Sequence, residues 1–550
     1  MGLSTTDIVV VVIYAIAIFS LAQYVAREKK GHEKDTSDYF LASKNLPWWA
    51  IGASLIAANI SAEQIVGMSG SGYAIGLAIA SYEWMAALTL LIVGKYFLPI
   101  FLTNQIYTMP QFLEQRYGHS IRILMTIFWL ALYVFVNLTS IIWLGSIAVN
   151  RVAGVDQNIA LIILAVFALA YQLYGGLKAI ALTDIVQVTL LVLGGLVVAF
   201  LTLTQVGGGH GVIAGFELLV KRVPDHFHMI LEPTGNATYD KDHYQNLPGL
   251  GVLIGGMWIA NLSYWGFNQY IIQRALAAKS VAEAQKGVTF AAYLKLLMPV
   301  ILVVPGIAAV VLAPDLPKPD QAYPTMMRLL PPGLLGLVFS ALVAAIVASL
   351  ASKINSIATI FTLDLYAKSK HIQTRAEDNT DPEGKPMEKH LVLVGRIVAI
   401  AAIIIALIVV RPLLGKSDQA FQYIQEFTGF FTPGITVIFL LGLFWKRATE
   451  AGAIVASVAS VLLSVIFKYT LPWPFLPAFA NGYVTPFMNR MFVVFWVSLA
   501  LAIIVSLLFP ARKESNRVTM EGVTFATPAV FNVGGLGVIL ILIALYATWW

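Results

Sequence analysis

Hydrophobic residues come in runs of about 20 along most of the chain, and short polar segments separate them. A run of this length crosses about 30 Å of hydrocarbon as an α-helix. The pattern predicts an all-α, polytopic membrane protein. We expect about 14 transmembrane helices, near residues 5–26, 47–73, 77–101, 121–150, 157–175, 178–206, 249–268, 281–313, 333–367, 389–411, 418–446, 450–469, 486–510 and 529–549.

The second and seventh expected helices carry polar residues and glycines in mid-span. The second holds Asn59 and Glu63 before a glycine-rich stretch at 67–72, and the seventh holds Asn261 and Asn268. Such helices are tolerated in hydrocarbon where their broken backbone lines a cavity enclosed by protein. Close helix packing is the alternative and accounts for the glycines. It does not account for a carboxylate and amides in mid-span, so both helices are predicted to be discontinuous.

Five helices separate the starts of these two segments, a spacing typical of two inverted five-helix repeats. In that architecture the broken helices meet near the bilayer midplane and form a substrate site. The expected organisation is a single transmembrane domain: 1–46 a peripheral helix and cytoplasmic loop, 47–206 the first repeat, 207–248 an extracellular polar connector, 249–446 the second repeat, and 447–550 peripheral helices.

The composition agrees with a membrane protein, because only 12% of the 550 residues are charged and 59% are hydrophobic. Soluble domains are about 25% charged. The net charge of +6 follows from Lys and Arg on alternate loops, which the positive-inside rule makes cytoplasmic. Both termini are therefore expected outside a plasma (inner) membrane, and no nucleic-acid partner is needed. The chain has no cysteine, which excludes disulfides and thiolate metal sites.

Asp184, Glu83 and Lys295 are ionisable residues within or beside the expected spans, where an ionised group costs at least about 2.5–3.5 kcal/mol. Asp184 follows a threonine and is open to a simple N-cap interpretation. The alternative interpretation of Glu83 is a carboxylate at the membrane interface. The alternative for Lys295 is a side chain that snorkels to the interface. Lys295 has long apolar flanks, which favours a polar cavity, and there its charge and that of Glu83 would compensate each other.

A cavity that is neutral overall and rich in amides favours a neutral polyol over an amino acid or an organic acid. Candidate amides are Asn59, Gln64, Asn261 and Gln425, and candidate aromatic plates for a sugar ring are Tyr82, Tyr264, Trp265 and Phe421. The phosphate-binding pattern GxxxxGK[ST] does not occur, so we expect an ion gradient, not ATP, to supply any driving force, and we expect no enzyme. A channel, a facilitator or a sugar sensor remains as the competing class, although a TVGYG filter is missing.

Several long motifs make the chain resemble the sodium:solute symporter family, and within it the bacterial sodium/galactose type. They are residues 38–42 (DYFLA), 46–50 (LPWWA), 54–64 (SLIAANISAEQ), 264–270 (YWGFNQY) and 421–426 (FQYIQE). The resemblance implies a leucine-transporter-type core and sodium-coupled import of galactose or glucose by alternating access. Sodium is then a transported ion, and the partners are a small neutral sugar, sodium and the lipid bilayer.

The same resemblance implies a role for each matching residue. Sugar would be bound by Gln64, Glu83, Asn261, Lys295 and Gln425, with Tyr264 closing its cytoplasmic face and Asn59 behind it. The outer gate would be Met68, Tyr82 and Phe421. Sodium would be bound by backbone carbonyls of Ala57, Ile60 and Ala345 and by the Ser349 hydroxyl, with Asp184 nearby.

Two positions depart from the family pattern. Ala86 stands where the galactose type has a sugar-binding serine, and Ala348 stands where the family has the first of two sodium-site serines. The first leaves open the transport of another polyol such as myo-inositol. The second leaves open a proton-coupled variant with Asp184 as the carrier.

Overall fold

The computed structural model describes residues 2–26, 46–106, 108–367, 369–370, 385–417, 419–469, 486–509 and 518–550. Within these ranges the side chains of 19, 21–26, 173–185, 237–238, 363 and 385–389 lie outside the description. The expected cytoplasmic loop at 27–45 and the motif at 38–42 therefore lie outside the described residues, as does the side chain of Asp184.

The described residues form helices and connecting turns without a strand. The α-helices are α1 (Thr5–Ala26), α3 (Trp48–Asn59), α4 (Ser69–Ile75), α5 (Ser81–Ile92), α6 (Leu98–Thr103), α7 (Met109–Arg116), α8 (His119–Ala131), α9 (Thr139–Ala153), α10 (Gln157–Val206), α11 (Val212–Arg222), α12 (Ala237–Asp242), α13 (Met257–Phe267), α14 (Gln269–Leu276), α15 (Val281–Leu312), α16 (Ala322–Met327), α17 (Leu334–Thr359), α18 (Lys385–Leu414), α19 (Ala420–Thr428), α20 (Thr432–Phe444), α21 (Glu450–Tyr469), α22 (Phe487–Leu508) and α23 (Ala529–Trp549). Short 3₁₀ or π-helical turns are η2 (Glu63–Met68), η3 (Leu77–Ala80), η4 (Val93–Phe97), η5 (Leu132–Leu138), η6 (Pro224–His226), η7 (Val252–Gly256), η8 (Pro319–Gln321) and η9 (Ile360–Ala367).

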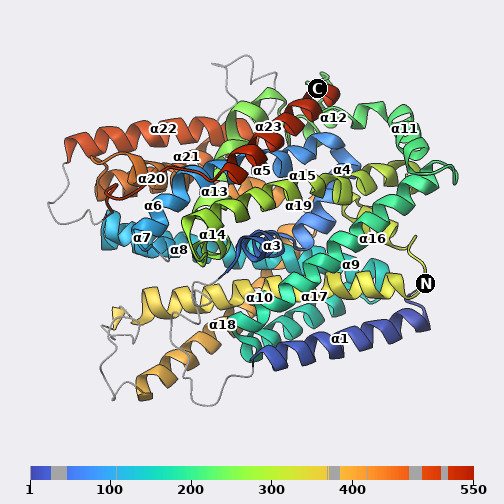
Figure 1. Ribbon diagram of the computed structural model, residues 1–550, viewed down its shortest axis with the longest axis horizontal. Helices are drawn as coiled ribbons and strands as arrows, with labels where there is room; N and C mark the ends of the chain where they lie inside the picture. The colour runs from blue at the N-terminus through green and yellow to red at the C-terminus, as the bar shows by residue number, and fades with distance from the viewer. Residues whose placement is uncertain are drawn as a thin grey trace.

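Nine helices of the described part are long and apolar enough to cross a membrane, or 11 if each of two bent pairs is one span. The prediction of a polytopic helical membrane protein is confirmed at this level. Figure 1 shows α1 and α18 at one edge of the bundle and α22 and α23 at the opposite edge. The outer helices expose apolar side chains, as on α18, where Ile408 is 68% exposed. Such faces fit contact with lipid.

The first predicted discontinuity is present. The chain bends by 68° between α3 and the helical segment Glu63–Ile75. The bend follows from Ile60, which ends α3 in an extended conformation (φ −68°, ψ 114°). Beyond it the chain re-enters a helix as the wide π-helical turn η2.

The seventh expected helix is also interrupted. Gly255 has non-helical angles (φ −125°, ψ −114°) inside η7, and Asn268 is extended between α13 and α14. Glycine has no Cβ and so tolerates such angles at little steric cost. Both helices predicted to be broken are therefore broken.

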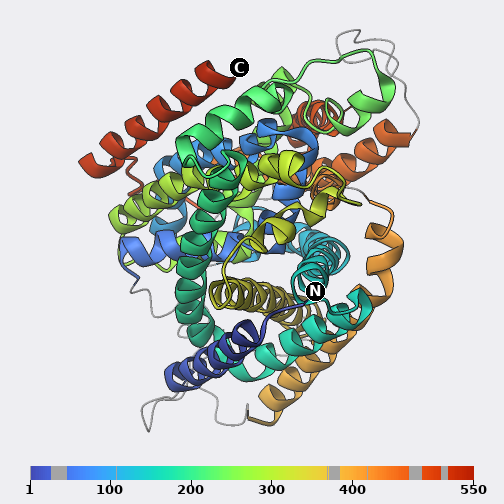
Figure 2. The ribbon, with the colours of Figure 1, turned by 90° about the vertical axis from the view of Figure 1, so that its right-hand side faces the viewer.

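Two expectations about individual segments were wrong. A second bent pair, α19 and α20, turns by 46° where one continuous helix was expected at 418–446. The expected helices at 157–175 and 178–206 are both helical but run on without the expected break as α10, so Asp184 is not an N-cap. As a straight helix, the 50 residues of α10 would be about 75 Å long. Figure 2 shows that α10 changes direction instead. The connector at 207–248 is partly helical, because it contains α11 and α12.

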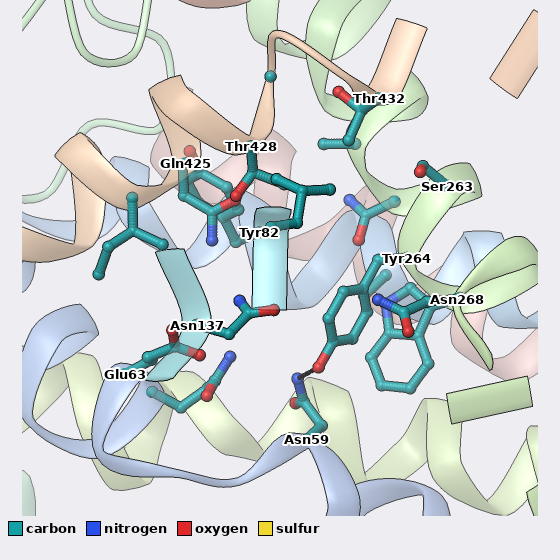
Figure 3. Close-up of a pocket in the computed structure, with 18 of the residues that line it drawn as sticks. Asn59, Glu63, Tyr82, Asn137, Ser263, Tyr264, Asn268, Gln425, Thr428 and Thr432 are labelled. Carbon is teal, nitrogen blue, oxygen red and sulfur yellow. Dashed lines mark hydrogen bonds between the residues drawn. The ribbon is translucent and has the colours of Figure 1, made fainter. Parts of the chain in front are cut away.

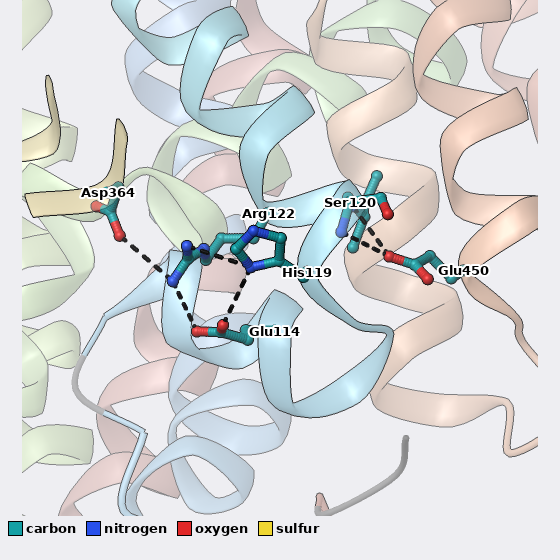
Figure 4. A network of polar contacts seen from close by, with 7 residues as sticks. Glu114, His119, Ser120, Arg122, Asp364 and Glu450 are labelled. Atoms are coloured by element: carbon teal, nitrogen blue, oxygen red, sulfur yellow. Dashed lines mark hydrogen bonds and ion pairs between the residues drawn. The ribbon is translucent and has the colours of Figure 1, made fainter. Parts of the chain in front are cut away.

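A polar network at one end of the bundle joins α7, α8 and η9 (Figure 4). Arg122, only 1% exposed, lies 2.8 Å from Glu114 and 3.8 Å from Asp364. On the other side of α8, a carboxylate oxygen of Glu450 accepts a hydrogen bond from the Ser120 backbone N–H at 2.7 Å. Buried arginine is costly without such partners, so these contacts fix how the helix ends meet.

Glycines let α15 approach the broken second helix closely. A Cβ at Gly306 would collide with the backbone oxygen of Ser69, and a Cβ at Gly72 would lie 2.9 Å from the backbone oxygen of Val303. Small residues allow this contact between backbones. The approach matters for function because α15 carries Lys295 toward the interior.

We expect Gly306→Ala to lower the thermal stability of the detergent-solubilised protein. Overpacking costs about 1–3 kcal/mol, more than the helix propensity that alanine adds. Gly535→Ala in α23 is the matched control, since its Cβ would meet Leu91 at an ordinary 3.5 Å. An equal melting temperature for Gly306→Ala and Gly535→Ala would contradict the close packing.

Candidate functional site

A cavity lies where the broken helices meet in the middle of the bundle. It encloses about 1040 Å³ of empty space, part of it open to solvent. Residues from η2, α5, η5, α13, α15 and α19 line it, so it draws on both halves of the sequence. Figure 3 shows Asn59 and Tyr264 on one side, with Gln425 and Thr428 across the space from them.

The cavity brings together the whole set of residues predicted to bind or gate a sugar. Its lining includes Asn59, Gln64, Met68, Tyr82, Glu83, Asn261, Tyr264, Lys295, Phe421 and Gln425, and also Ala86 and Trp265. These side chains come from six separate helical segments. Their convergence is a property of the tertiary structure, and it was expected from the sequence only through the broken-helix pattern and the resemblance.

A buried ion pair is the strongest interaction in the cavity. The Lys295 ammonium on α15 donates to Glu83 Oε2 on α5 at 2.5 Å, and also to Asn59 Oδ1. The two side chains are 1% and 3% exposed. The interfacial interpretation of Glu83 and the snorkelling interpretation of Lys295 are therefore both wrong. Each charge compensates the other, which leaves this part of the cavity neutral.

A chain of hydrogen bonds continues from this pair to the cytoplasmic gate residue expected from the resemblance. Asn59 Nδ2 donates to the Tyr264 hydroxyl at 3.0 Å, and the Tyr264 and Tyr270 hydroxyls lie 2.5 Å apart. On the other side of the cavity, the rings of Tyr82 and Phe421 meet edge to face at 5.1 Å. At each candidate gate, side chains of different helices are therefore in contact: Asn59 with Tyr264 at one, and Tyr82 with Phe421 at the other.

Asn261 has a hydrogen-bonding group to offer a ligand. Its Nδ2 is buried without a hydrogen-bond partner among the described residues, while its side chain lines the cavity. A buried donor without a partner costs about 1–3 kcal/mol. A ligand with hydroxyl oxygens would satisfy it. The cavity wall also includes the aromatic ring of Trp265, which lies 5.0 Å from the Lys295 ammonium.

A second, smaller pocket lies at the end of α3. Its lining includes Ala57, Ile60, Ala345, Ser349 and Ala348, so the structure brings together the sodium-site residues expected from α3, the break and α17. The side chain of Asp184 is the exception, since it lies outside the described residues. The last carbonyls of a helix lack intrahelical partners and carry the negative end of its dipole. This pocket therefore has the chemistry to hold a small cation.

Several lining residues were not singled out from the sequence. In the larger cavity they include Tyr133, Asn137, Thr428 and Thr432. The break at residues 429–431 places the two threonines there, and Gly429 with Pro433 was its signal. In the smaller pocket they include Arg274 and Lys353. An ionisable residue inside an expected span is a signal, and the same criterion identified Lys295.

Comparison with known proteins identifies the family to which the chain belongs. The sodium:solute symporter family model matches residues 39–459. The chain belongs to the sodium:solute symporter family. It is a sodium-coupled symporter and a multi-pass membrane protein, which makes it a transporter, not an enzyme.

Curated relatives include the sodium/glucose cotransporter of Vibrio parahaemolyticus, 47% identical over 100% of this chain and 99% of that protein. The sodium/myo-inositol cotransporter 2 of Bos taurus is 34% identical over 84% of this chain and 70% of that protein. The structure of a sodium-coupled sialic acid symporter superposes with a TM-score of 0.73 at 20% identity, covering 93% of this chain and 99% of the other. The structure of a nucleobase-cation-symport-1 family transporter in a closed conformation superposes with a TM-score of 0.54 at 12% identity, covering 88% of this chain and 98% of the other. At these identities the two structures support the fold alone.

We expect Glu83→Gln and Lys295→Met each to lower stability by about 3–5 kcal/mol, because either change leaves an uncompensated buried charge. The double variant should be more stable than either single variant. Thermal unfolding in detergent measures this, with Lys286→Met as the control, since Lys286 and Glu283 form a pair of partly exposed side chains 3.1 Å apart. Additive losses in the double variant would contradict the pairing.

Proposed function

We propose that the protein imports a small neutral sugar, galactose or glucose, together with sodium by alternating access. The observation that carries this proposal is the composition of the cavity: a self-compensated ion pair, six amide side chains and an unsatisfied donor on one of them, Asn261. Such a lining offers many hydrogen bonds. Lys295, the basic residue of the described lining, is paired with Glu83, so no free positive charge is available to recognise an anionic substrate. The names of the Vibrio and bovine relatives support a neutral polyol as the substrate.

Within this cavity we assign sugar contacts to Gln64, Glu83, Asn261, Lys295 and Gln425. Tyr264 would close the cytoplasmic side of the sugar, held by its hydrogen bond from Asn59. Met68, Tyr82 and Phe421 would close the outer side, which is supported by the edge-to-face contact of the two rings. Movement of the two gates in alternation would expose the sugar first outside and then inside.

We place sodium in the smaller pocket, on the backbone carbonyls of Ala57, Ile60 and Ala345 and on the Ser349 hydroxyl, with Asp184 nearby. Ile60 stands at the break, so a bound cation would tie the end of α3 to α17. One sodium ion crossing about 100 mV supplies about 2.3 kcal/mol. A tenfold sodium gradient adds about 1.4 kcal/mol. Their sum would sustain sugar accumulation on the order of several hundred-fold.

We also propose the full topology expected from the sequence: 14 spans, inverted repeats at 47–206 and 249–446, peripheral segments at 1–46 and 447–550, and an extracellular segment at 207–248. The nine long helices, the two bent pairs, the short apolar helices Thr5–Ile18 and Gln157–Gln172, and η7 with α13 together support this number. An even number of spans places both termini on one side, and the basic loops favour the outside of the plasma (inner) membrane for them.

Uptake by proteoliposomes tests the proposed substrate. We expect a sodium gradient to drive uptake of labelled galactose or glucose, and the accompanying charge movement to be inhibited when the inside is made positive. A panel of hexoses with myo-inositol decides the substrate. Transport of every panel member without sodium would instead support a facilitator. Uptake driven by protons alone would contradict sodium coupling.

Gln64→Ala should weaken sugar binding by about 0.5–1.5 kcal/mol, the range for a neutral hydrogen bond. Glu83→Gln should weaken it by about 1.5–3 kcal/mol, because it removes a charged partner. Isothermal titration with galactose and glucose measures both. Wild-type affinity in Glu83→Gln would remove Glu83 from the sugar site.

The proposed sodium site predicts that substitutions at the neighbouring residues Ala348 and Ser349 have opposite effects on sodium-driven uptake. Ser349→Ala should abolish sodium-driven uptake, since Ala348 offers no second hydroxyl. Ala348→Ser should lower the half-saturating sodium concentration about fivefold, which corresponds to one net polar contact of about 1 kcal/mol. Sodium titrations of initial uptake rates measure both. Unchanged uptake in Ser349→Ala would exclude the assigned site.

A further inference from the structure

Lys353 brings a positive charge into the pocket that has the chemistry for sodium. It lies on α17 one helical turn beyond Ser349, is 4% exposed, and lines the same pocket as Ala57, Ile60 and Ala345. Burial of an ammonium group among backbone carbonyls and small residues is costly and calls for a specific partner. The proposed transport cycle does not use this residue.

The ammonium group of Lys353 is held on the face of an aromatic ring. Its Nζ lies 4.0 Å from the centroid of the Tyr270 ring on α14. Glu63 of η2 is near enough to interact with it electrostatically. The other charged group that lines the pocket is Arg274 of α14, and Asp184 of α10 lies outside the described side chains. The face of an aromatic ring attracts a cation, and the attraction is stronger in a desolvated site.

This aromatic ring also connects the two pockets. Tyr270 lines the smaller pocket, and its hydroxyl lies 2.5 Å from that of Tyr264, which lines the cavity. Tyr264 in turn accepts a hydrogen bond from Asn59, the last residue of α3. A movement of the Lys353 ammonium on or off the ring therefore acts one hydrogen bond away from the cavity.

We propose that Lys353 is a tethered cation that competes with sodium for the smaller pocket. An ammonium group has three donors and suits the same carbonyl and hydroxyl oxygens as sodium. With sodium bound, like-charge repulsion keeps Lys353 on the Tyr270 ring. Without sodium, the side chain turns toward the oxygens and leaves the ring.

The competition would couple sodium to the sugar through Tyr270 and Tyr264. Sodium favours the state in which Lys353 holds the Tyr270 ring, and that state positions the Tyr264 hydroxyl against the cavity. By linkage, a sugar that stabilises Tyr264 in this position must raise the affinity for sodium by the same factor. Lys353 and Tyr270 are thus positioning residues and touch neither ligand in the coupled state.

The test measures the half-saturating sodium concentration of full-length protein, both from uptake in proteoliposomes and from sodium-induced thermal stabilisation in detergent. We expect Lys353→Met to lower this concentration about tenfold, which corresponds to about 1.4 kcal/mol. Lys353→Arg keeps the charge and should stay near wild type. Lys468→Met is the matched control, because Lys468 also pairs with a carboxylate and lies over a ring, 3.0 Å from Glu426 and 4.6 Å from the Phe427 centroid.

An unchanged or higher half-saturating concentration in Lys353→Met would overturn the proposal and leave Lys353 as a counter-charge for Glu63. Lys353→Gln replaces Lys353→Met if the latter fails to fold, and the same outcomes apply. Tyr270→Phe adds an independent test, since it keeps the ring but removes the hydroxyl. It should leave sodium binding in the absence of sugar near wild type and abolish the shift in sodium affinity that sugar causes. A full shift would contradict the coupling path.

The proposal rests on the proposed sodium-coupled transport, and the two can fail separately. Sodium-independent uptake by wild type that becomes sodium-dependent in Lys353→Met would contradict the proposed function and support competition by Lys353. Sodium-dependent uptake with the same sodium titration in wild type and Lys353→Met would support the function and overturn the inference.

Discussion

A backbone polar group has no water to pair with inside hydrocarbon, and this constraint governs the whole molecule. A helix that breaks in mid-membrane must place its freed carbonyls and amides where protein surrounds them. Here α3 ends at Asn59, η7 is interrupted at Gly255, and α19 ends short of α20. The larger cavity lies among these segments and the smaller pocket at the end of α3, so each site lies beside irregular backbone.

Buried charged side chains also need partners inside the protein. Glu83 and Lys295 compensate each other across the cavity, while Lys353 has a ring on one side and the Glu63 carboxylate within electrostatic reach. Because each of these charges depends on a partner from another helix, the relative position of the helices sets the cost of every charge. Movement between helices then changes electrostatic energies, which is how an ion can bias a conformational equilibrium.

The hydrogen-bonded path from Tyr270 through Tyr264 and Asn59 to Lys295 links the two pockets without a long-range mechanism. Asn59 belongs to both regions, since it lines the larger cavity and ends the helix whose last turn lines the smaller pocket. Coupling of two ligands requires an element whose two states each ligand prefers differently. The end of α3 and the two tyrosines have the connections that such an element needs.

The sequence by itself determined the membrane class, most helix positions, and the breaks in the second and seventh expected helices. Those properties depend on local hydrophobicity and on polar residues that hydrocarbon does not tolerate, and both can be read residue by residue. The resemblance supplied the sets of residues that the structure gathers in two pockets. The sequence also predicted that Glu83 and Lys295 compensate each other, and the structure shows the direct contact. Tertiary structure alone decided that α19 and α20 bend apart, and that Lys353 lies on Tyr270 in the smaller pocket. Each of these depends on how distant helices face one another, and a linear pattern fixes the apolar face of a helix but not the neighbour against which its polar side chains pack.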